Sequence, residues 1–175
     1  MEFRRIPLRQ SAPPTSDGKP RAQYAALPYR LNPGLEVLLV TSRGVGRWVI
    51  PKGWPIRGKS RRASAAVEAL EEAGVIGDVG KAPLGAYDYL KIMPNGEGLD
   101  CLVTVFPLRV LQRKLRWREQ DQRQWNWFDW RSAAAAVAEP GLAEIIRQFA
   151  EGFPAEASAP GVVVPPPRPD DSIET

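Results

Sequence analysis

Residues 48–75 constrain the fold more than any other part of the chain, and they read WVIPKGWPIRGKSRRASAAVEALEEAGV. An apolar run typical of a strand ends at Pro51, and a loop rich in glycine and cations follows it. The next residues predict a helix, because Ser60 is a suitable N-cap and Gly74 stands where a left-handed C-cap residue is expected. The stretch therefore predicts a strand, a basic loop and a helix in immediate succession.

The predicted helix has an apolar face and an acidic face. Small and aliphatic residues recur at steps of three and four and are expected to pack on a sheet: Ala63, Ala66, Val67, Leu70 and Ala73. The other face carries Glu68, Glu71 and Glu72. Glu68 and Glu72 are like charges four residues apart, and Glu71 and Glu72 lie in the last turn, where the negative end of the helix dipole repels them by ~0.3–1 kcal/mol each. A hard divalent cation bound by these carboxylates would relieve the repulsion. The alternative is an ordinary solvated helix end.

The loop before the helix is strongly basic. No acidic residue lies between Thr41 and Val67, whereas seven cations do: Arg43, Arg47, Lys52, Arg57, Lys59, Arg61 and Arg62. A metal-bound polyphosphate requires cations and backbone N–H groups for its phosphates and carboxylates for its metal. A solvated loop is the alternative for the basic run taken alone. The basic loop and the acidic helix together favour a site for such a ligand.

The segment 53–75 resembles the Nudix box. The box pattern is Gly, five residues, Glu, seven residues, Arg-Glu, an apolar residue, any residue, Glu-Glu, any residue, Gly and an apolar residue. The residues in register with it are Gly53, Glu68, Ala69, Glu71, Glu72, Gly74 and Val75. The preceding Pro51-Lys52 is similar to members related to diphosphoinositol-polyphosphate and diadenosine-polyphosphate hydrolases.

Two positions depart from the box pattern. Lys59 stands where the family usually has Glu, and Val67 stands where it usually has Arg. In the family these two side chains pair and brace the loop against the helix. Loss of both partners is milder than loss of one, because no charge is left without a counter-ion. The departure bears on activity more than on fold.

The resemblance implies a fold and a reaction. The implied fold is a Nudix-type α/β/α sandwich over residues 21–152, with a mixed curved sheet flanked by the box helix and a C-terminal helix. The implied activity is that of a pyrophosphohydrolase, dependent on Mg²⁺ or Mn²⁺, which cleaves a phosphoanhydride linkage in an anionic polyphosphate small molecule such as a dinucleoside polyphosphate or an inositol pyrophosphate. The alternative is a catalytically impaired Nudix-like module that binds a phosphorylated ligand or an RNA 5′ end.

The resemblance also assigns site residues. Glu68, Glu71 and Glu72 are the expected catalytic residues, and with the carbonyl of Gly53 they are expected to bind the metal. Residues 117–130 are similar to the family outside the box, which makes Glu119 a further metal candidate. The cations expected to bind substrate are Arg43, Arg47, Lys52, Arg57, Lys59 and Lys91. Because Lys59 replaces an acid, we hypothesise a more anionic substrate than ADP-ribose.

Two aromatic patterns have alternative interpretations. Tyr87, Tyr89 and Lys91 alternate, so they share one face of a strand and form either a pocket wall or a packed sheet edge. The segment 117–130 interleaves tryptophan with arginine, which is also typical of single-stranded nucleic-acid binding. However, Trp125 and Trp127 alternate with polar and aromatic neighbours as in a strand, which favours core packing. No nucleic-acid partner is expected.

The remaining chain predicts strands at 23–30, 36–42, 47–50, 85–93, 100–110 and 125–130, and helices at 132–138 and 140–149. The chain has no histidine, which excludes histidine-based nucleophile systems and zinc sites. The single cysteine, Cys101, is expected to be a buried thiol of a cytoplasmic protein. We expect no membrane partner, a monomer or homodimer, and tails at 1–20 and 153–175 that are rich in proline.

Overall fold

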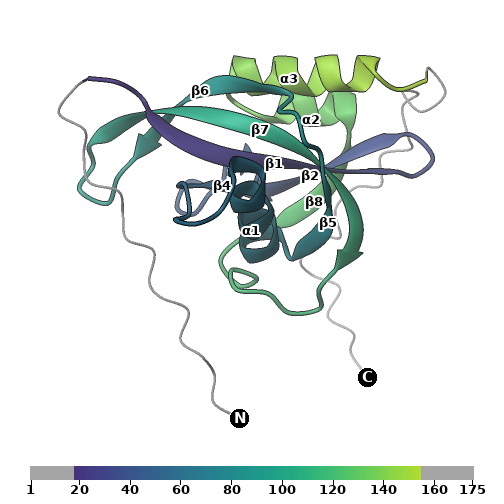
Figure 1. Ribbon diagram of the computed structural model, residues 1–175, viewed down its shortest axis with the longest axis horizontal. Coiled ribbons are helices and arrows are strands. Elements are labelled where there is room, and N and C mark those ends of the chain that lie inside the picture. Colours follow the sequence, from purple (N-terminus) through teal and green to yellow (C-terminus); the bar gives the residue numbers. More distant parts are fainter. Residues whose placement is uncertain (1–17, 155–175) are drawn as a thin grey trace, which may run out of the picture.

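An eight-stranded sheet carries three helices in the computed structural model (Figure 1). The structure describes residues 18–154, so most of both predicted tails lies outside the described residues and the domain limits 21–152 stay a prediction. The elements in chain order are β1 (Arg21–Leu31), β2 (Leu35–Thr41), β3 (Trp48–Val49), β4 (Lys52–Gly53), α1 (Arg61–Ala73), β5 (Val75–Val79), β6 (Gly85–Ile92), β7 (Gly98–Arg113), β8 (Trp125–Asp129), α2 (Trp130–Ala136) and α3 (Pro140–Glu151).

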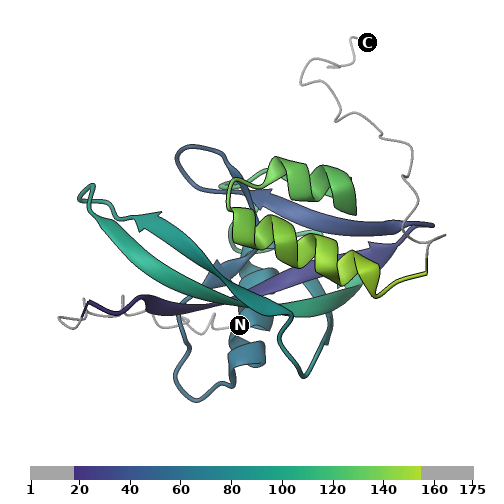
Figure 2. The ribbon, with the colours of Figure 1, turned by 90° about the horizontal axis from the view of Figure 1, so that it is seen from above.

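The sheet is mixed, as predicted. Its central pair, β1 and β7, is parallel and aligns Ala25 with Val105, whereas all other strand pairs are antiparallel. The strand order is β3-β2-β1-β7-β5, with β4 beside β1, β6 beside β7 and β8 beside β2. The long strand β7 pairs with β6 in its first part and with β5 in its last part, so it belongs both to the hairpin β6–β7 and to the main sheet. Figure 2 shows this hairpin extending beyond the helices.

Two hydrophobic cores lie on opposite faces of the sheet. In β2, Val37 and Leu39 pack in the core covered by α2 and α3, while Leu38 and Val40 pack in the core covered by α1. All four side chains are fully buried, which explains why this strand reads as a continuous apolar run instead of an alternating one. The predicted α/β/α sandwich is thus confirmed, with helices on both faces of the sheet (Figures 1 and 2).

The buried face of α1 differs from the predicted one. Its core contact is made by Ala65, Ala69 and Ala73, at steps of four residues, and of these only Ala73 belonged to the predicted face. Val67 and Leu70, which were expected in the core, are only partly buried. The small alanine side chains let the helix lie close to the sheet. The helix is consequently rotated so that two of its glutamates are buried as well.

Both predicted caps of α1 are confirmed. The Ser60 hydroxyl oxygen accepts a hydrogen bond of 3.2 Å from the backbone N–H of Ala63. Gly74 has φ +69°, and its N–H donates to the carbonyls of Ala69 and Leu70. This left-handed residue turns the chain directly into β5, which the sequence did not predict. β5 is a strand because it pairs with the distal half of β7.

The aromatic segment after β7 is partly in the core. Trp127, Phe128 and Trp130 pack against the two cores, in agreement with the predicted core packing. Trp125 is 39% exposed, and the Arg113 guanidinium lies 3.2 Å from its ring centroid, so core packing was wrong for this residue. Trp130 begins α2 and does not end the strand, because the Asp129 carboxylate caps the helix.

Cys101 is 1% exposed, which confirms the predicted buried thiol. Among residues 18–154, no helix is both long enough and apolar enough to cross a membrane.

We expect Gly74→Ala to lower the free energy of unfolding more than Gly96→Ala does. Both glycines have positive φ, of +69° and +84°, so either alanine should cost about 1–2 kcal/mol of backbone strain. A Cβ at position 74 would also lie 2.6 Å from ring carbons of Trp117, whereas a Cβ at position 96 has nothing within 4 Å. Urea unfolding of the two variants measures the difference. Equal losses would mean that Trp117 yields at no cost.

Candidate active site

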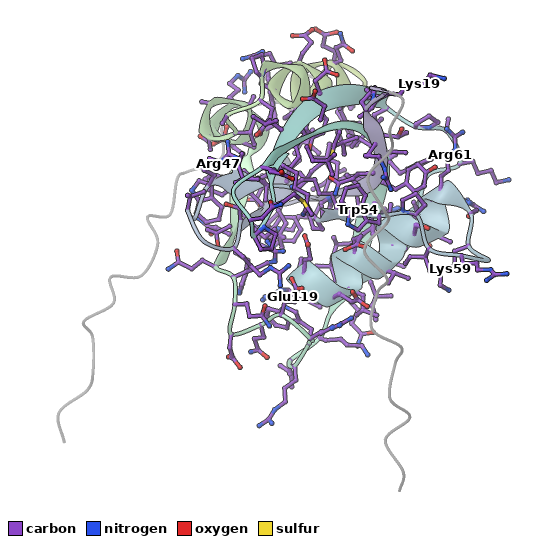
Figure 3. The ribbon with its side chains drawn as sticks, turned by 90° about the vertical axis from the view of Figure 1, so that its left-hand side faces the viewer. Lys19, Arg47, Trp54, Lys59, Arg61 and Glu119 are labelled. Atoms are coloured by element: carbon purple, nitrogen blue, oxygen red, sulfur yellow. The ribbon has the colours of Figure 1, made fainter. Side chains whose placement is uncertain are left out.

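A cavity of about 700 Å³ lies beside the C-terminal half of α1. Its walls come from α1, β4, the loop between β2 and β3, the hairpin β6–β7, and the loop of residues 114–124 between β7 and β8. Figure 3 labels three of the lining residues: Arg47 from the β2–β3 loop, Trp54 from the loop that follows β4, and Glu119 from the 114–124 loop. Segments far apart in sequence therefore meet at one place, next to the predicted Nudix box.

All residues predicted to bind metal line this cavity. Glu68, Glu71 and Glu72 come from α1, Gly53 comes from β4, and Glu119 comes from the 114–124 loop. The Glu68 and Glu72 residues are only 1% and 8% exposed. β4 pairs with β1, aligning Gly53 with Tyr24, and this pairing holds the first box residue beside the helix.

Four of the six predicted substrate-binding cations line the same cavity: Arg43, Arg47, Lys52 and Lys91. Arg57 and Lys59 do not line it and are exposed. In Figure 3, Lys59 lies beyond the N-terminal end of α1, whereas Glu119 lies near the other end. The hypothesis that Lys59 selects a more anionic substrate gains no support from this position.

The loop before α1 is held by a serine in this chain. The fully buried Ser64 hydroxyl oxygen accepts a hydrogen bond of 3.2 Å from the Ile56 N–H, and the Lys59 N–H donates 3.0 Å to the Ile56 carbonyl. These bonds fix the loop although the residues at positions 59 and 67 cannot form the ion pair that the box pattern provides. The departures from the pattern therefore leave the loop attached to the helix.

Arg123 is a site residue that the sequence did not predict. Its guanidinium donates to Glu72 Oε1 at 2.8 Å, to Glu119 Oε2 at 2.7 Å and to the Thr41 carbonyl at 2.8 Å. The Arg123 side chain is 8% exposed. Glu119 and Arg123 are four residues apart, a spacing that favours an ion pair within a helix, but no sequence signal pointed to Glu72.

The donor types fit a hard divalent cation, whereas their present positions fit arginines. Carboxylate and carbonyl oxygens are the preferred ligands of Mg²⁺ and Mn²⁺. In the described part of the chain, however, no three acidic side chains are gathered as a ligand set. Glu71 is paired with Arg118 at 3.2 Å, and Glu72 with Arg123 at 2.8 Å. Metal binding would therefore require these carboxylates to exchange partners.

Lys52 is a partly buried cation that lines the cavity. Its Nζ lies 4.2 Å from the Tyr89 ring centroid, and its backbone N–H donates 3.2 Å to Glu72 Oε2. Burial lowers the pKa of Lys52 to about 8, although the nearby Glu72 charge raises it in part. Burial likewise raises the pKa of Glu72, with Arg123 and Lys52 acting against this.

An aromatic wall completes the cavity. Tyr89 and Trp54 line it, and Lys91 Nζ lies 5.7 Å from the Trp54 ring centroid. Tyr87, on the same face of β6, is 3% exposed and belongs to the core under α2 and α3. Of the two interpretations of this alternating pattern, the pocket wall describes Tyr89 and Lys91, whereas Tyr87 is packed, on a strand that pairs with β7.

Solved structures share this fold. An Ap4A hydrolase of Caenorhabditis elegans aligns with a TM-score of 0.56 and 17% identity over 77% of this chain and 98% of that one. A Nudix hydrolase of Nitrosomonas europaea aligns with a TM-score of 0.58 and 22% identity over 77% and 90%. An ADP-ribose pyrophosphatase of Streptococcus suis aligns with a TM-score of 0.55 and 18% identity over 77% and 92%.

Sequence relatives give the family. No family model matches the chain. Nudix hydrolase 13, mitochondrial, of Arabidopsis thaliana is 30% identical over 67% of this chain, which spans 62% of that protein. Nudix hydrolase 17, mitochondrial, of the same plant is 29% identical over 80% of this chain and 79% of its own length. Because these names give mitochondria for the relatives, the cytoplasmic location stays a prediction. The chain belongs to the Nudix hydrolase family.

Proposed function

We propose that the chain is a divalent-metal-dependent hydrolase that cleaves a phosphoanhydride linkage in a polyphosphorylated small molecule, such as a dinucleoside polyphosphate or an inositol pyrophosphate. One observation carries this proposal: carboxylates and cations line the same cavity of about 700 Å³. The carboxylates are those of the box helix, and the cations come from the β2–β3 loop, β4 and β6. A ligand that combines a metal with several phosphates satisfies both groups.

The structural neighbours support the reaction class. Two of them are named Ap4A hydrolase and ADP-ribose pyrophosphatase. The cations that line the cavity, which include Arg43 and Arg47, favour a ligand with several negative charges. The aromatic side chains of Trp54 and Tyr89 offer ring faces to a non-phosphate part of the same ligand.

In the proposed mechanism, the carboxylates of Glu68, Glu71 and Glu72 and the Gly53 carbonyl would hold the metal. When bound there, Mg²⁺ or Mn²⁺ would supply Lewis-acid chemistry, which polarises phosphoryl oxygens and lowers the pKa of an attacking water. Lys52 and Lys91 bind phosphate oxygens and stabilise the charge that develops on the leaving phosphate. Because Lys52 is partly buried, its electrostatic effect there is stronger than at the surface.

The alternative is a module that binds a phosphorylated ligand without cleaving it. One observation favours it: arginines are paired with Glu71, Glu72 and Glu119. A protein that binds anions without metal has no need to free these carboxylates, so the pairs can persist in it. The two functions differ in their need for metal. An enzyme of the proposed type requires divalent cations for turnover, whereas the module binds the same ligands in EDTA.

We expect Glu72→Gln to reduce the rate of hydrolysis at least about 100-fold. Mutation of a residue that only hydrogen-bonds to a metal ligand already costs up to about 100-fold, and loss of a ligand itself should cost no less. The amide keeps the side-chain volume and removes the charge that would bind the metal. Phosphate release is measured with Mg²⁺ and with Mn²⁺ on diadenosine polyphosphates, inositol pyrophosphates, nucleoside triphosphates and ADP-ribose. Glu144→Gln, on α3 and outside the cavity lining, is the matched control. Absence of turnover across the panel, together with ligand binding in EDTA, would establish the binding module.

We expect kcat/KM to fall about 10-fold between pH 7.5 and 9.5 in the wild type, and to fall less in Lys52→Arg. Lys52 is a cation below its pKa of about 8 and neutral above it, whereas arginine keeps its charge. Since the folded pKa lies below the ordinary value of 10.5, deprotonation of Lys52 adds to stability between these two values as pH rises. The titration of Lys52 therefore does not unfold the protein in this pH range, and unfolding caused by it cannot account for the fall in kcat/KM. If kcat/KM fell equally with pH in the wild type and in Lys52→Arg, Lys52 would not be a substrate-binding residue.

We expect Lys91→Gln to raise KM about 10-fold, which corresponds to about 1.4 kcal/mol, and Lys59→Gln to leave KM unchanged. Both variants lose one lysine charge, but only Lys91 lines the cavity. Steady-state kinetics on the best substrate of the panel compare the two. A larger rise of KM in Lys59→Gln than in Lys91→Gln would mean that Lys59 contacts the substrate, because the loop before α1 closes over it on binding.

A further inference from the structure

Arg123 takes the place in the cavity that a cation would take. Its guanidinium nitrogens lie 2.8 Å from Glu72 Oε1 and 2.7 Å from Glu119 Oε2. Glu72 belongs to the set proposed to bind metal, and Glu119 is the further metal candidate that the sequence predicts. A divalent cation and a guanidinium that share a carboxylate oxygen repel each other, so the two cannot be bound there with full strength at the same time.

The three bonds of Arg123 reach three different elements. They join α1 through Glu72, the 114–124 loop through Glu119, and the end of β2 through the Thr41 carbonyl. The Gln124 N–H beside it also donates 2.9 Å to the Thr41 hydroxyl. The same loop is also bonded to α1 by the Glu119 N–H, which donates 3.0 Å to the Glu71 carbonyl, and by Arg118, which pairs with the Glu71 carboxylate. A cation that took Glu72 would therefore displace the Arg123 guanidinium while the backbone of the loop stays attached to the helix.

The other arginines near these glutamates are weaker competitors. Arg118 pairs with Glu71 at 3.2 Å and is 45% exposed, and Arg43 lies 3.9 Å from Glu119 and is 60% exposed. Exposed ion pairs contribute little, because water and salt screen them. Arg123 is 8% exposed and forms all its bonds at 2.8 Å or less. The competition with metal is thus decided at Arg123.

We propose that Arg123 is a positioning residue that acts as an internal counter-ion: it competes with the divalent cation for Glu72 and Glu119, and metal binding displaces its guanidinium from these carboxylates. This inference rests on the proposed metal-dependent function. It implies that the protein binds metal more weakly than its carboxylates would allow without the arginine. By linkage, metal must weaken the Arg123 contacts by the same factor.

The first test is Mn²⁺ binding to the full-length protein, measured by calorimetry and by electron paramagnetic resonance. We expect Arg123→Gln to bind Mn²⁺ at least about 10-fold more tightly than the wild type, within the usual range of coupling between sites. Arg123→Lys keeps one charge but cannot bridge both carboxylates, so an intermediate affinity is expected. Arg30→Gln is the matched control, because it removes another arginine–glutamate pair, at 2.6 Å from Glu36, outside the cavity.

The second test uses the wild-type protein and does not depend on the folding of a variant. The Arg123 Nε–H donates to Glu119 and is shielded, so its NMR signal should exchange slowly with water without metal. Its absence from the spectrum of Arg123→Lys assigns it. We expect saturation with Mg²⁺ to shift this signal or to make it exchange rapidly, while the signal of Arg30 Nε–H is unchanged.

The outcomes separate this inference from the proposed function. Equal Mn²⁺ affinities of the wild type and Arg123→Gln, or an Arg123 signal unaffected by saturating Mg²⁺, would overturn the inference; if Glu72→Gln still abolished metal binding and turnover, the proposed function would stand. If no variant bound Mn²⁺, both would be overturned in favour of the metal-independent module.

Discussion

Burial of negative charge beside the sheet is the constraint on which the site depends. Glu72 is 8% exposed, and a carboxylate removed from water must be neutralised or hydrogen-bonded. Arg123 and the backbone N–H of Lys52 provide these bonds to its two oxygens. The compensation draws β4 and the 114–124 loop onto α1. The cavity is therefore formed by the same interactions that make the buried glutamate tolerable.

The chemistry of the cavity follows from a balance of opposite charges. Carboxylates from α1 lie near cations that include Lys52, whose pKa burial lowers to about 8. Each set of charges stabilises the other. A bound metal would neutralise the carboxylates, and a bound polyphosphate would neutralise the cations. In the absence of such a ligand, arginines satisfy the glutamates. The site thus has internal partners for the groups that the proposed ligand would bind.

Several parts of this arrangement were predictable and several were not. The caps Ser60 and Gly74 were correct, because capping depends on neighbours within one turn. The buried face of α1 was wrong, because hydrophobicity favoured Val67 and Leu70, while close packing on the sheet selected the smaller alanines. Trp125 was expected in the core, but it is exposed and its ring contacts the guanidinium of Arg113. Arg113 ends β7, a strand whose distance from Trp125 the local sequence does not reveal.

The sequence by itself determined the box helix, its three glutamates and the family, since spacing along one helix fixes which side chains are neighbours. Only the tertiary structure decided which cations join them. It brought Lys91 to the cavity and left Lys59 outside it, and it inserted Arg123 between Glu72 and Glu119. These residues come from β6, from the loop before α1 and from the loop before β8, and their distances depend on strand pairing, which local spacing does not encode.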